Sequence, residues 1–208
     1  MTSAADLTAP TAGRGRGRPR SAAADAAILE ATRAVLAEDG WAALTVEGVA
    51  ARAGVAKTTV YRRFSSRADL AVEAVAQLVA AARTAPGSGA AEDIGNAIRA
   101  NAEIYSRPAA RAAYLAVIAE AGRDPALRAA VEGRVIAPAR RMVAEGLERA
   151  VARGEITRRV AESRLDLLYD VLAGALLHRL LVREAEIDDA FIETLTAAVL
   201  VALRAPDA

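Results

Sequence analysis

Apolar residues recur at intervals of three and four along most of this chain, the spacing that places side chains on one face of an α-helix. Val46, Val49, Ala50 and Ala53 form one such stripe. No segment alternates apolar and polar residues with the period of two typical of a strand, and no repeat of solenoid length is present. The pattern therefore predicts an all-α protein.

Start and stop signals at the ends of these stripes divide the chain into expected helices. Gly40, Gly54 and Gly154 each end a stripe, whereas Pro108 and Pro138 stand where a helix can begin or kink. The expected helices lie at about 22–38, 46–53, a short stretch through Val60, 67–83, 94–105, 108–121, a short stretch from Pro125, 138–153, 161–183 and 188–204.

Two segments lack this apolar periodicity and mark the domain organisation. Residues 1–20 are small, polar and rich in glycine and arginine, so we expect them to be a disordered basic arm. The segment Pro86-Gly87-Ser88-Gly89 is the clearest linker in the chain. We therefore predict an arm at 1–20, a head at 21–84 and a second helical domain at 90–208.

The head contains two short helices joined by a tight turn. Gly54 can adopt the left-handed conformation that ends the first helix, and the second helix follows within a few residues. This is the helix-turn-helix arrangement, whose second helix enters the major groove of DNA. Polar residues suited to phosphates and base edges are expected to project from it: Lys57, Thr58, Thr59, Arg62 and Arg63.

The stretch from Thr45 to Phe64 resembles the DNA-binding motif of the TetR family of bacterial repressors, and the resemblance extends over roughly residues 22–83. One departure is Ala56, which stands where a serine often caps the recognition helix, a cap that can be worth ~1 kcal/mol. The residues that stand at the motif positions are Thr45, Val49, Ala50, Ala53, Gly54, Val55, Ala56, Thr59, Tyr61 and Phe64, followed by Arg67 and Leu70.

The resemblance implies a function and a set of partners. A family member would be a homodimeric transcriptional regulator, most often a repressor, that binds double-stranded operator DNA and leaves it when a small-molecule effector, here unknown, occupies the second domain. The resemblance also implies phosphate contacts from Thr45, Tyr61 and Arg67. Tyr61 could instead be a core residue.

The charge distribution agrees with a DNA-binding head. Between Arg14 and Arg67 ten basic residues stand against five acidic ones, a local excess of +5 in a chain of net charge +1. The arm contains Arg-Gly-Arg-Pro, similar to an AT-hook core, so Arg16 and Arg18 are candidates for an A·T minor groove. The arm could also be an unselective tail. An architectural protein that bends A·T-rich DNA is the alternative function.

The second domain offers candidate dimer and effector residues. The last two expected helices carry long apolar edges that need a partner, either a second copy or the rest of the monomer. Tyr105, Tyr114 and Tyr169 could line an effector pocket or be ordinary core tyrosines. The candidate dimer residues are Leu172, Leu176, His178, Leu180, Phe191, Leu195 and Val199.

Composition and motifs argue against several other functional classes. There is no cysteine, and His178 is the only histidine, so no zinc or iron site with strong ligands is expected. No nucleophile–base pair or phosphate-binding loop is recognisable, so we expect neither an enzyme nor a cofactor. The chain has no apolar run long enough to span a bilayer and no secretory signal, which is compatible with the cytoplasm.

Overall fold

The computed structural model describes residues 18–204, with side chains from Ala22 onward, and its regular elements there are all helices. The expected all-α fold is confirmed. The elements are α1 (Arg18–Glu38), α2 (Gly40–Ala43), α3 (Val46–Ala53), α4 (Lys57–Tyr61), α5 (Arg67–Ala81), α6 (Ala90–Ser106), α7 (Pro108–Ala121), α8 (Pro125–Val131), the π-helical turn η1 (Glu132–Ile136), α9 (Ala137–Ala152), α10 (Arg158–Leu177), the π-helical turn η2 (His178–Val182) and α11 (Asp189–Arg204).

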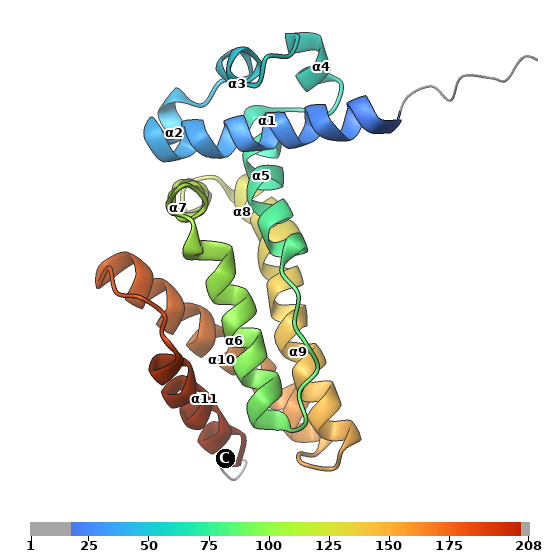
Figure 1. Cartoon of the computed structure of the whole chain (residues 1–208), viewed down its shortest axis with the longest axis vertical. Coiled ribbons are helices and arrows are strands. Elements are labelled where there is room, and N and C mark those ends of the chain that lie inside the picture. Colours follow the sequence, from blue (N-terminus) through green and yellow to red (C-terminus); the bar gives the residue numbers. More distant parts are fainter. Residues whose placement is uncertain (1–17, 205–208) are drawn as a thin grey trace, which may run out of the picture.

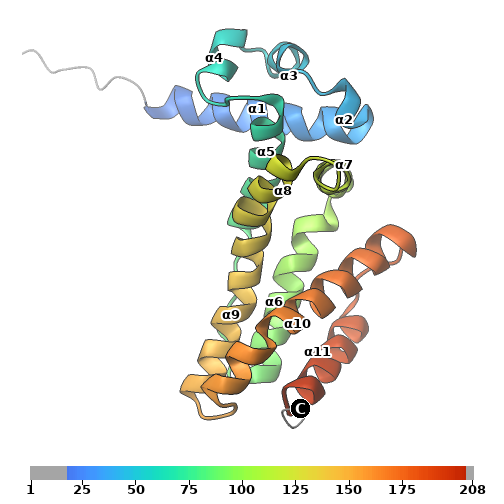
Figure 2. The same cartoon turned by 180° about the vertical axis from the view of Figure 1, so that it is seen from behind.

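The helices form a head set across one end of an elongated body (Figure 1). Helix α1 lies crosswise at that end, with α2, α3 and α4 on its outer side, and α5 leaves the head and runs along the body. Helices α6 and α9 extend along the body, while α10 and α11 form its flank, as the reverse view also shows (Figure 2). Helix α7 lies directly beneath α1.

Several helix ends lie where the sequence places them, for identifiable reasons. Helix α7 begins at Pro108, and Asp124 caps α8 by accepting hydrogen bonds from the backbone N–H groups of Ala126 at 2.9 Å and Leu127 at 3.2 Å. Helix α1 begins at Arg18, about one turn before the expected start, so the predicted arm overlaps it. Residues 1–17, with Arg16, lie outside the described residues.

The helix expected to open or kink at Pro138 is continuous from α8 through η1 into α9. Proline cannot donate a backbone hydrogen bond, and its ring crowds the carbonyl four residues earlier. The turn η1 precedes Pro138, and the N–H of Ala137 bonds to the carbonyl of Glu132, five residues back. The wider π-helical turn therefore lets the helix pass the proline without ending.

Two apolar cores run through the molecule, and the first joins the head to the body. Ile28 of α1 and Leu70 of α5 belong to the same buried cluster as Ile104 of α6 and Val117 of α7. A second cluster packs α6, α9, α10 and α11 in the lower body. The predicted division at 84–90 follows the linker but does not separate the cores, because α7 packs across α1.

Candidate nucleic-acid interface

The helix-turn-helix is formed by α3 and α4 on the outer side of the head (Figure 1). The Thr45 hydroxyl caps α3 by accepting a hydrogen bond from the Gly48 N–H at 3.0 Å. Gly54 ends the helix at φ +67°, where a side chain would be strained. Val49 and Val60 are fully buried and fix the two helices against the first core.

The recognition helix α4 has only five residues and a weak start. Ala56 occupies its N-cap position and provides no side-chain hydrogen bond, so the expected missing cap is confirmed. Without a hydroxyl at this position, the first N–H groups of α4 have no side-chain acceptor at the cap. The helix depends instead on burial of Val60 and Phe64.

The outer surface of α4 carries exposed polar side chains, as expected. Lys57, Thr58 and Arg62 are exposed, and Thr59 is half-buried. Tyr61 is 54% exposed, so it is not a core residue. Its hydroxyl donates to Oε1 of Glu47 at 3.4 Å, and Lys57 Nζ lies 3.4 Å from the same oxygen.

Arg63 has a different orientation from the one the sequence predicts. Its guanidinium forms an ion pair with Asp25 of α1 and donates to the carbonyl of Thr59 at 3.1 Å. The side chain is half-buried between the recognition helix and α1. The prediction that Arg63 projects outward is therefore wrong, because helix α1 supplies a carboxylate on its inner side.

A shallow recess of about 290 Å³ brings together the three residues that the motif implies for phosphate contacts. Thr45, Tyr61 and Arg67 all line it, from the start of α3, the end of α4 and the start of α5. The guanidinium carbon of Arg67 lies 5.5 Å from the centre of the Trp41 ring, a cation–π contact that orients the exposed side chain. The recess has the donors that a DNA phosphate requires.

Comparisons with known proteins match both parts of the chain. Residues 28–74 match the model described as "Bacterial regulatory proteins, tetR family", and residues 87–199 match "Tetracyclin repressor-like, C-terminal domain". Together these models cover more than half of the chain. The chain belongs to the TetR family.

Individual TetR-family proteins agree with this assignment along nearly the whole length. The chain is 33% identical to the DNA-binding transcriptional repressor TetR of Mycobacteroides abscessus, over 93% of this chain and 98% of the relative. It is 30% identical to the HTH-type transcriptional regulator Rv1556 of Mycobacterium tuberculosis, over 81% and 86%. The crystal structure of the TetR family regulator SCO0332 superposes with a TM-score of 0.63 at 31% identity, covering 88% of this chain and 99% of that one.

The protein is thus a DNA-binding transcriptional regulator of the TetR family, and the comparisons give no support to an architectural DNA protein. The matched family is one of bacterial regulatory proteins. Among residues 18–204, no cluster of three or more His, Asp or Glu side chains is placed to hold a metal ion. None of the described helices is long and apolar enough to cross a membrane.

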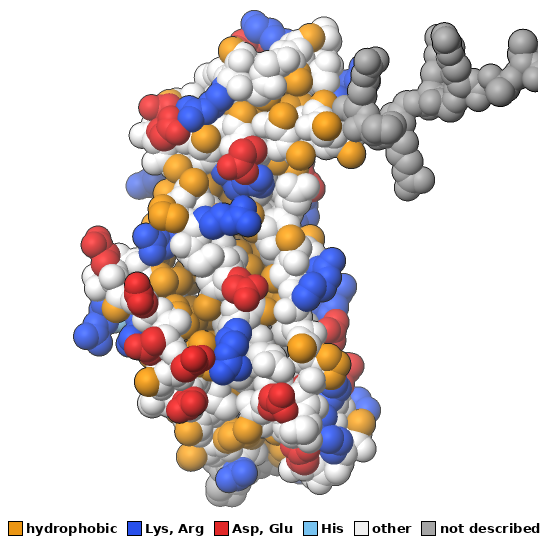
Figure 3. All heavy atoms as spheres, in the orientation of Figure 1, with side chains coloured by type: hydrophobic (Ala, Val, Ile, Leu, Met, Phe, Trp, Pro, Cys, Tyr) orange, Lys and Arg blue, Asp and Glu red, His pale blue; other side chains and the backbone are white. Residues whose placement is uncertain are grey.

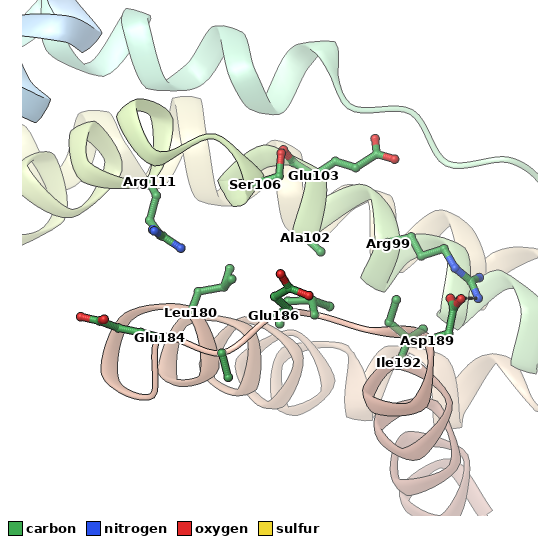
Figure 4. Close-up of a pocket in the computed structure, with 12 residues that line it drawn as sticks. Arg99, Ala102, Glu103, Ser106, Arg111, Leu180, Glu184, Glu186, Asp189 and Ile192 are labelled. Atoms are coloured by element: carbon green, nitrogen blue, oxygen red, sulfur yellow. Dashed lines mark hydrogen bonds and ion pairs between the residues drawn. The ribbon is translucent and has the colours of Figure 1, made fainter.

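The body of this TetR-family protein contains two sizeable cavities. The first, about 570 Å³, lies between α6, α7, η2 and the loop that leads to α11 (Figure 4). The second, about 590 Å³, lies where α1, α5 and α6 meet and is lined by Arg33, Leu78 and Arg107. Both are large enough for a small organic ligand. We call the first cavity the α7 cleft.

The three candidate effector tyrosines line neither of these cavities. Tyr105 and Tyr114 are buried with their ring centres 4.8 Å apart at 64°, an edge-to-face pair between α6 and α7. Tyr169 is half-buried and packs against both cores. Burial raises the pKa of all three hydroxyls, which stay protonated. Their positions favour the alternative interpretation of core tyrosines.

The leucine edge that suggested a dimer surface faces the interior of the monomer. Leu172, Leu176 and Leu180 are buried, Leu176 to 1% exposure, and Leu195 and Val199 pack in the same lower core as Leu176. Since these side chains have almost no surface left for a partner, the predicted interface residues need correction. The reason is that Leu172 and Leu176 pack in the lower core of their own chain, and Leu180, in η2, packs in the first core.

Other predicted interface residues differ in their exposure. His178 is exposed, while Phe191 is half-buried beneath Arg179, whose guanidinium carbon lies 4.3 Å from the ring centre. The apolar side chains that do reach the surface of α10 are Leu167, 55% exposed, and Val171, 42% exposed. They precede His178 at spacings of eleven and seven residues, on one face of the helix. This second apolar stripe can be read from the sequence, but the longer stripe of leucines on the same helix was selected as the interface instead.

Proposed function

We propose that this protein is a homodimeric repressor that binds operator DNA with α4 and releases it when a small molecule occupies the body. The recess that gathers Thr45, Tyr61 and Arg67 is the observation that carries the DNA-binding part. It lies beside the exposed side chains of α4, so phosphates and base edges would be contacted from one surface. The Mycobacteroides abscessus relative, described as a repressor, supports the direction of regulation.

In this proposal each polar residue of the head has a defined role. Lys57, Thr58, Thr59 and Arg62 contact base edges in the major groove, and the residues of the recess contact phosphates. Glu47 holds Lys57 and Tyr61 in the free protein, but exposed pairs of this kind are weak because water and salt screen them. A phosphate or base can therefore replace Glu47. Arg16 and Arg18 would enter the adjacent minor groove.

The dimer is proposed to form through the exposed apolar face of the flank. Leu167 and Val171 of α10 and Val201 of α11, 68% exposed, supply apolar surface, and His178 extends that face of α10. A two-fold axis through this flank would present two recognition helices to half-sites about 34–36 Å apart, or a multiple of that spacing.

The effector would act through α7. This helix contributes Arg111 to the α7 cleft and also packs across α1, so a ligand that moves α7 moves the base of the head. Because both contacts belong to one packed helix, a small displacement changes the separation of the two heads. The ligand then favours the conformation that does not match the operator.

The test of this proposal is an operator selected from random DNA by the purified full-length protein, followed by footprinting and affinity measurement. A two-fold symmetric protected site is expected, with log affinity falling by about 0.9 per neutralised phosphate for each unit of log salt. Arg62→Ala should relax base preference within the half-site. Arg123→Ala, an exposed arginine in the turn between α7 and α8, is the matched control and should change neither quantity. Uniform protection without a preferred site would contradict the proposal.

A further inference from the structure

Arg111 has an unusual environment among the arginines of the body. It is half-buried, and it has no hydrogen-bond or ion-pair partner among the described residues. The other half-buried arginines of the body all bond to a carboxylate or a carbonyl: Arg134, Arg140, Arg149, Arg164 and Arg179. No nitrogen of the Arg111 guanidinium is sealed from solvent, so its donors remain open to an acceptor that enters from outside the protein.

The position of Arg111 shows where its acceptor would lie. Figure 4 shows the side chain extending from α7 into the α7 cleft, toward Leu180 of η2 on the opposite wall. The cleft beside it has an apolar floor of Ala102, Leu180, Ile187 and Ile192, of which Leu180 and Ile192 are buried. A guanidinium at one end of an apolar cleft is suited to a molecule with one anionic group and an apolar body.

The other charges of the cleft do not reverse this preference. Arg99 is paired with Asp189 at 3.4 Å, and both side chains are exposed. Three further carboxylates line the cleft and all are exposed: Glu103 on α6, and Glu184 and Glu186 on the loop that forms the far wall. Acidic side chains also gather on that flank of the body (Figure 3). Exposed charges are screened by water and salt, so their effect on a bound ligand is small beside that of a half-buried, bidentate donor.

We infer that the α7 cleft binds an organic anion, with its carboxylate or equivalent anionic group on Arg111 and its apolar part on Leu180, Ile187 and Ile192. This inference deepens the proposed function, on which it rests, by naming the chemical class of the effector. Arg111 was not among the candidate residues selected from the sequence. A planar guanidinium can donate two parallel hydrogen bonds to a carboxylate, which a lysine in the same place could not.

The test uses a series of straight-chain carboxylates, from butanoate through dodecanoate, each matched with the alcohol and the primary amine of the same chain. Binding to the full-length protein is measured by calorimetry below the micelle-forming concentration of each compound. The carboxylate of the best chain length is expected to bind about tenfold or more tightly than its alcohol. Hydrogen bonds to charged groups are stronger than those between neutral groups, and the difference in free energy corresponds to about a tenfold change in affinity. The amine should bind more weakly than the alcohol.

Arg111→Gln should remove the advantage of the carboxylate and leave the affinity for the alcohol unchanged, because the apolar floor is intact. Arg111→Lys should retain only part of the advantage. Arg123→Gln, in the turn that follows α7 and outside the cleft, is the matched control and should bind like the parent protein. Circular dichroism checks that Arg111→Gln is folded, which is expected because the side chain has no partner to lose.

Three results would overturn the inference: no carboxylate binds more tightly than its alcohol, an amine binds as tightly as its carboxylate, or Arg111→Gln keeps the preference. Loss of the preference in Arg99→Gln, with Arg111→Gln unaffected, would place the anion elsewhere and count equally against it. Operator binding is measured in parallel. A carboxylate that binds through Arg111 but leaves the operator complex intact would sustain the site and refute its role as the effector site.

Discussion

Nη1 of Arg134 lies 2.6 Å from Oδ1 of Asp69, which joins the π-helical turn η1 of the body to the first turn of α5. Oδ2 of the same carboxylate accepts hydrogen bonds from Ser65, 2.8 Å from its N–H and 3.1 Å from its hydroxyl. Ser65 directly follows Phe64, which closes the helix-turn-helix. One carboxylate thus connects the body to the segment that positions α4, and Arg134 also pairs with Glu73.

We predict that Arg134→Ala lowers operator affinity several-fold while costing only about 1 kcal/mol of stability, as is typical of partly exposed ion pairs. The reason is that Asp69 would no longer be fixed from the body side, so the exit of α4 would be less well ordered. Anisotropy titrations and chemical denaturation measure the two effects. Arg140→Ala, which breaks a pair between α9 and Asp166 of α10 within the body, should leave DNA affinity unchanged. Equal loss of affinity in both variants would refute a specific role for Arg134.

Asp93 gives the molecule a predictable response to acid. Its carboxylate is fully buried; burial raises its pKa, but hydrogen bonds from the Gly87 N–H, Arg153 and Arg149 outweigh this and hold the pKa below its usual value. A folded-state pKa below the unfolded value of about 3.9 means that the contribution is complete above that pH. It is lost as the pH falls through the folded-state pKa.

We therefore predict that Asp93→Asn destabilises the protein at neutral pH by about 3 kcal/mol, because Arg149 and Arg153 lose a buried charged partner. The variant should also lose less stability than the parent between about pH 4 and pH 2. Urea denaturation across this range measures both. Asp166→Asn, in an exposed pair, is the control and should follow the parent curve. A pH profile of Asp93→Asn parallel to that of the parent would show that Asp93 is not the titrating group.

We predict opposite effects on folding for arginine substitutions at an exposed and at a buried apolar residue of α10. Val171→Arg places a charge on the exposed face and should yield a folded monomer with weak operator binding. Leu176→Arg buries an unpaired charge in the lower core and should unfold the body, at a cost on the order of 3–5 kcal/mol. Sedimentation and circular dichroism together distinguish the two results. Leu115→Arg, at an exposed leucine of α7, should remain dimeric; a dimeric Val171→Arg would move the interface elsewhere.

A single substitution can supply the side-chain N-cap that the recognition helix α4 lacks. Ala56→Ser would supply a hydroxyl able to accept a hydrogen bond from the N–H of Thr59, the third residue of α4, and should raise stability by up to about 1 kcal/mol. Ala51→Ser makes the same chemical change at an exposed position within α3 and should give no gain. Thermal unfolding measures the difference. No gain from Ala56→Ser relative to Ala51→Ser would mean that the backbone at Ala56 does not allow the cap.

The sequence sufficed for features that depend on neighbouring residues. Gly54, Pro108 and Asp124 mark helix ends through their own backbone preferences, so those ends could be predicted. Arg63 could not be placed, because its orientation depends on Asp25, which lies far along the chain on α1. The unpaired state of Arg111 is likewise invisible without the positions of every possible partner.

The leucines of α10 show a second limit. Periodicity identifies an apolar face but not what covers it, and Leu176 fits a monomer core as well as a dimer interface. The positions of α9 and α11 in the structure decide between a monomer core and a dimer interface. The π-helical turns η1 and η2 were also unpredicted, because one extra residue in a helical turn barely changes the pattern of apolar positions.

The core shared by α1, α5 and α7 bears on how far the DNA-reading part can be treated as a transferable module. Cutting the chain at the 82–89 linker would strip α7 from the apolar underside of α1 and expose Ile28 and its neighbours to water. A fragment ending near Arg83 would then aggregate more readily than the intact chain. A chimaera that exchanges DNA specificity between two relatives would need α1 of one protein to pack well against α7 of the other. The boundary that matters for such an exchange is therefore a packing surface and not a point in the sequence.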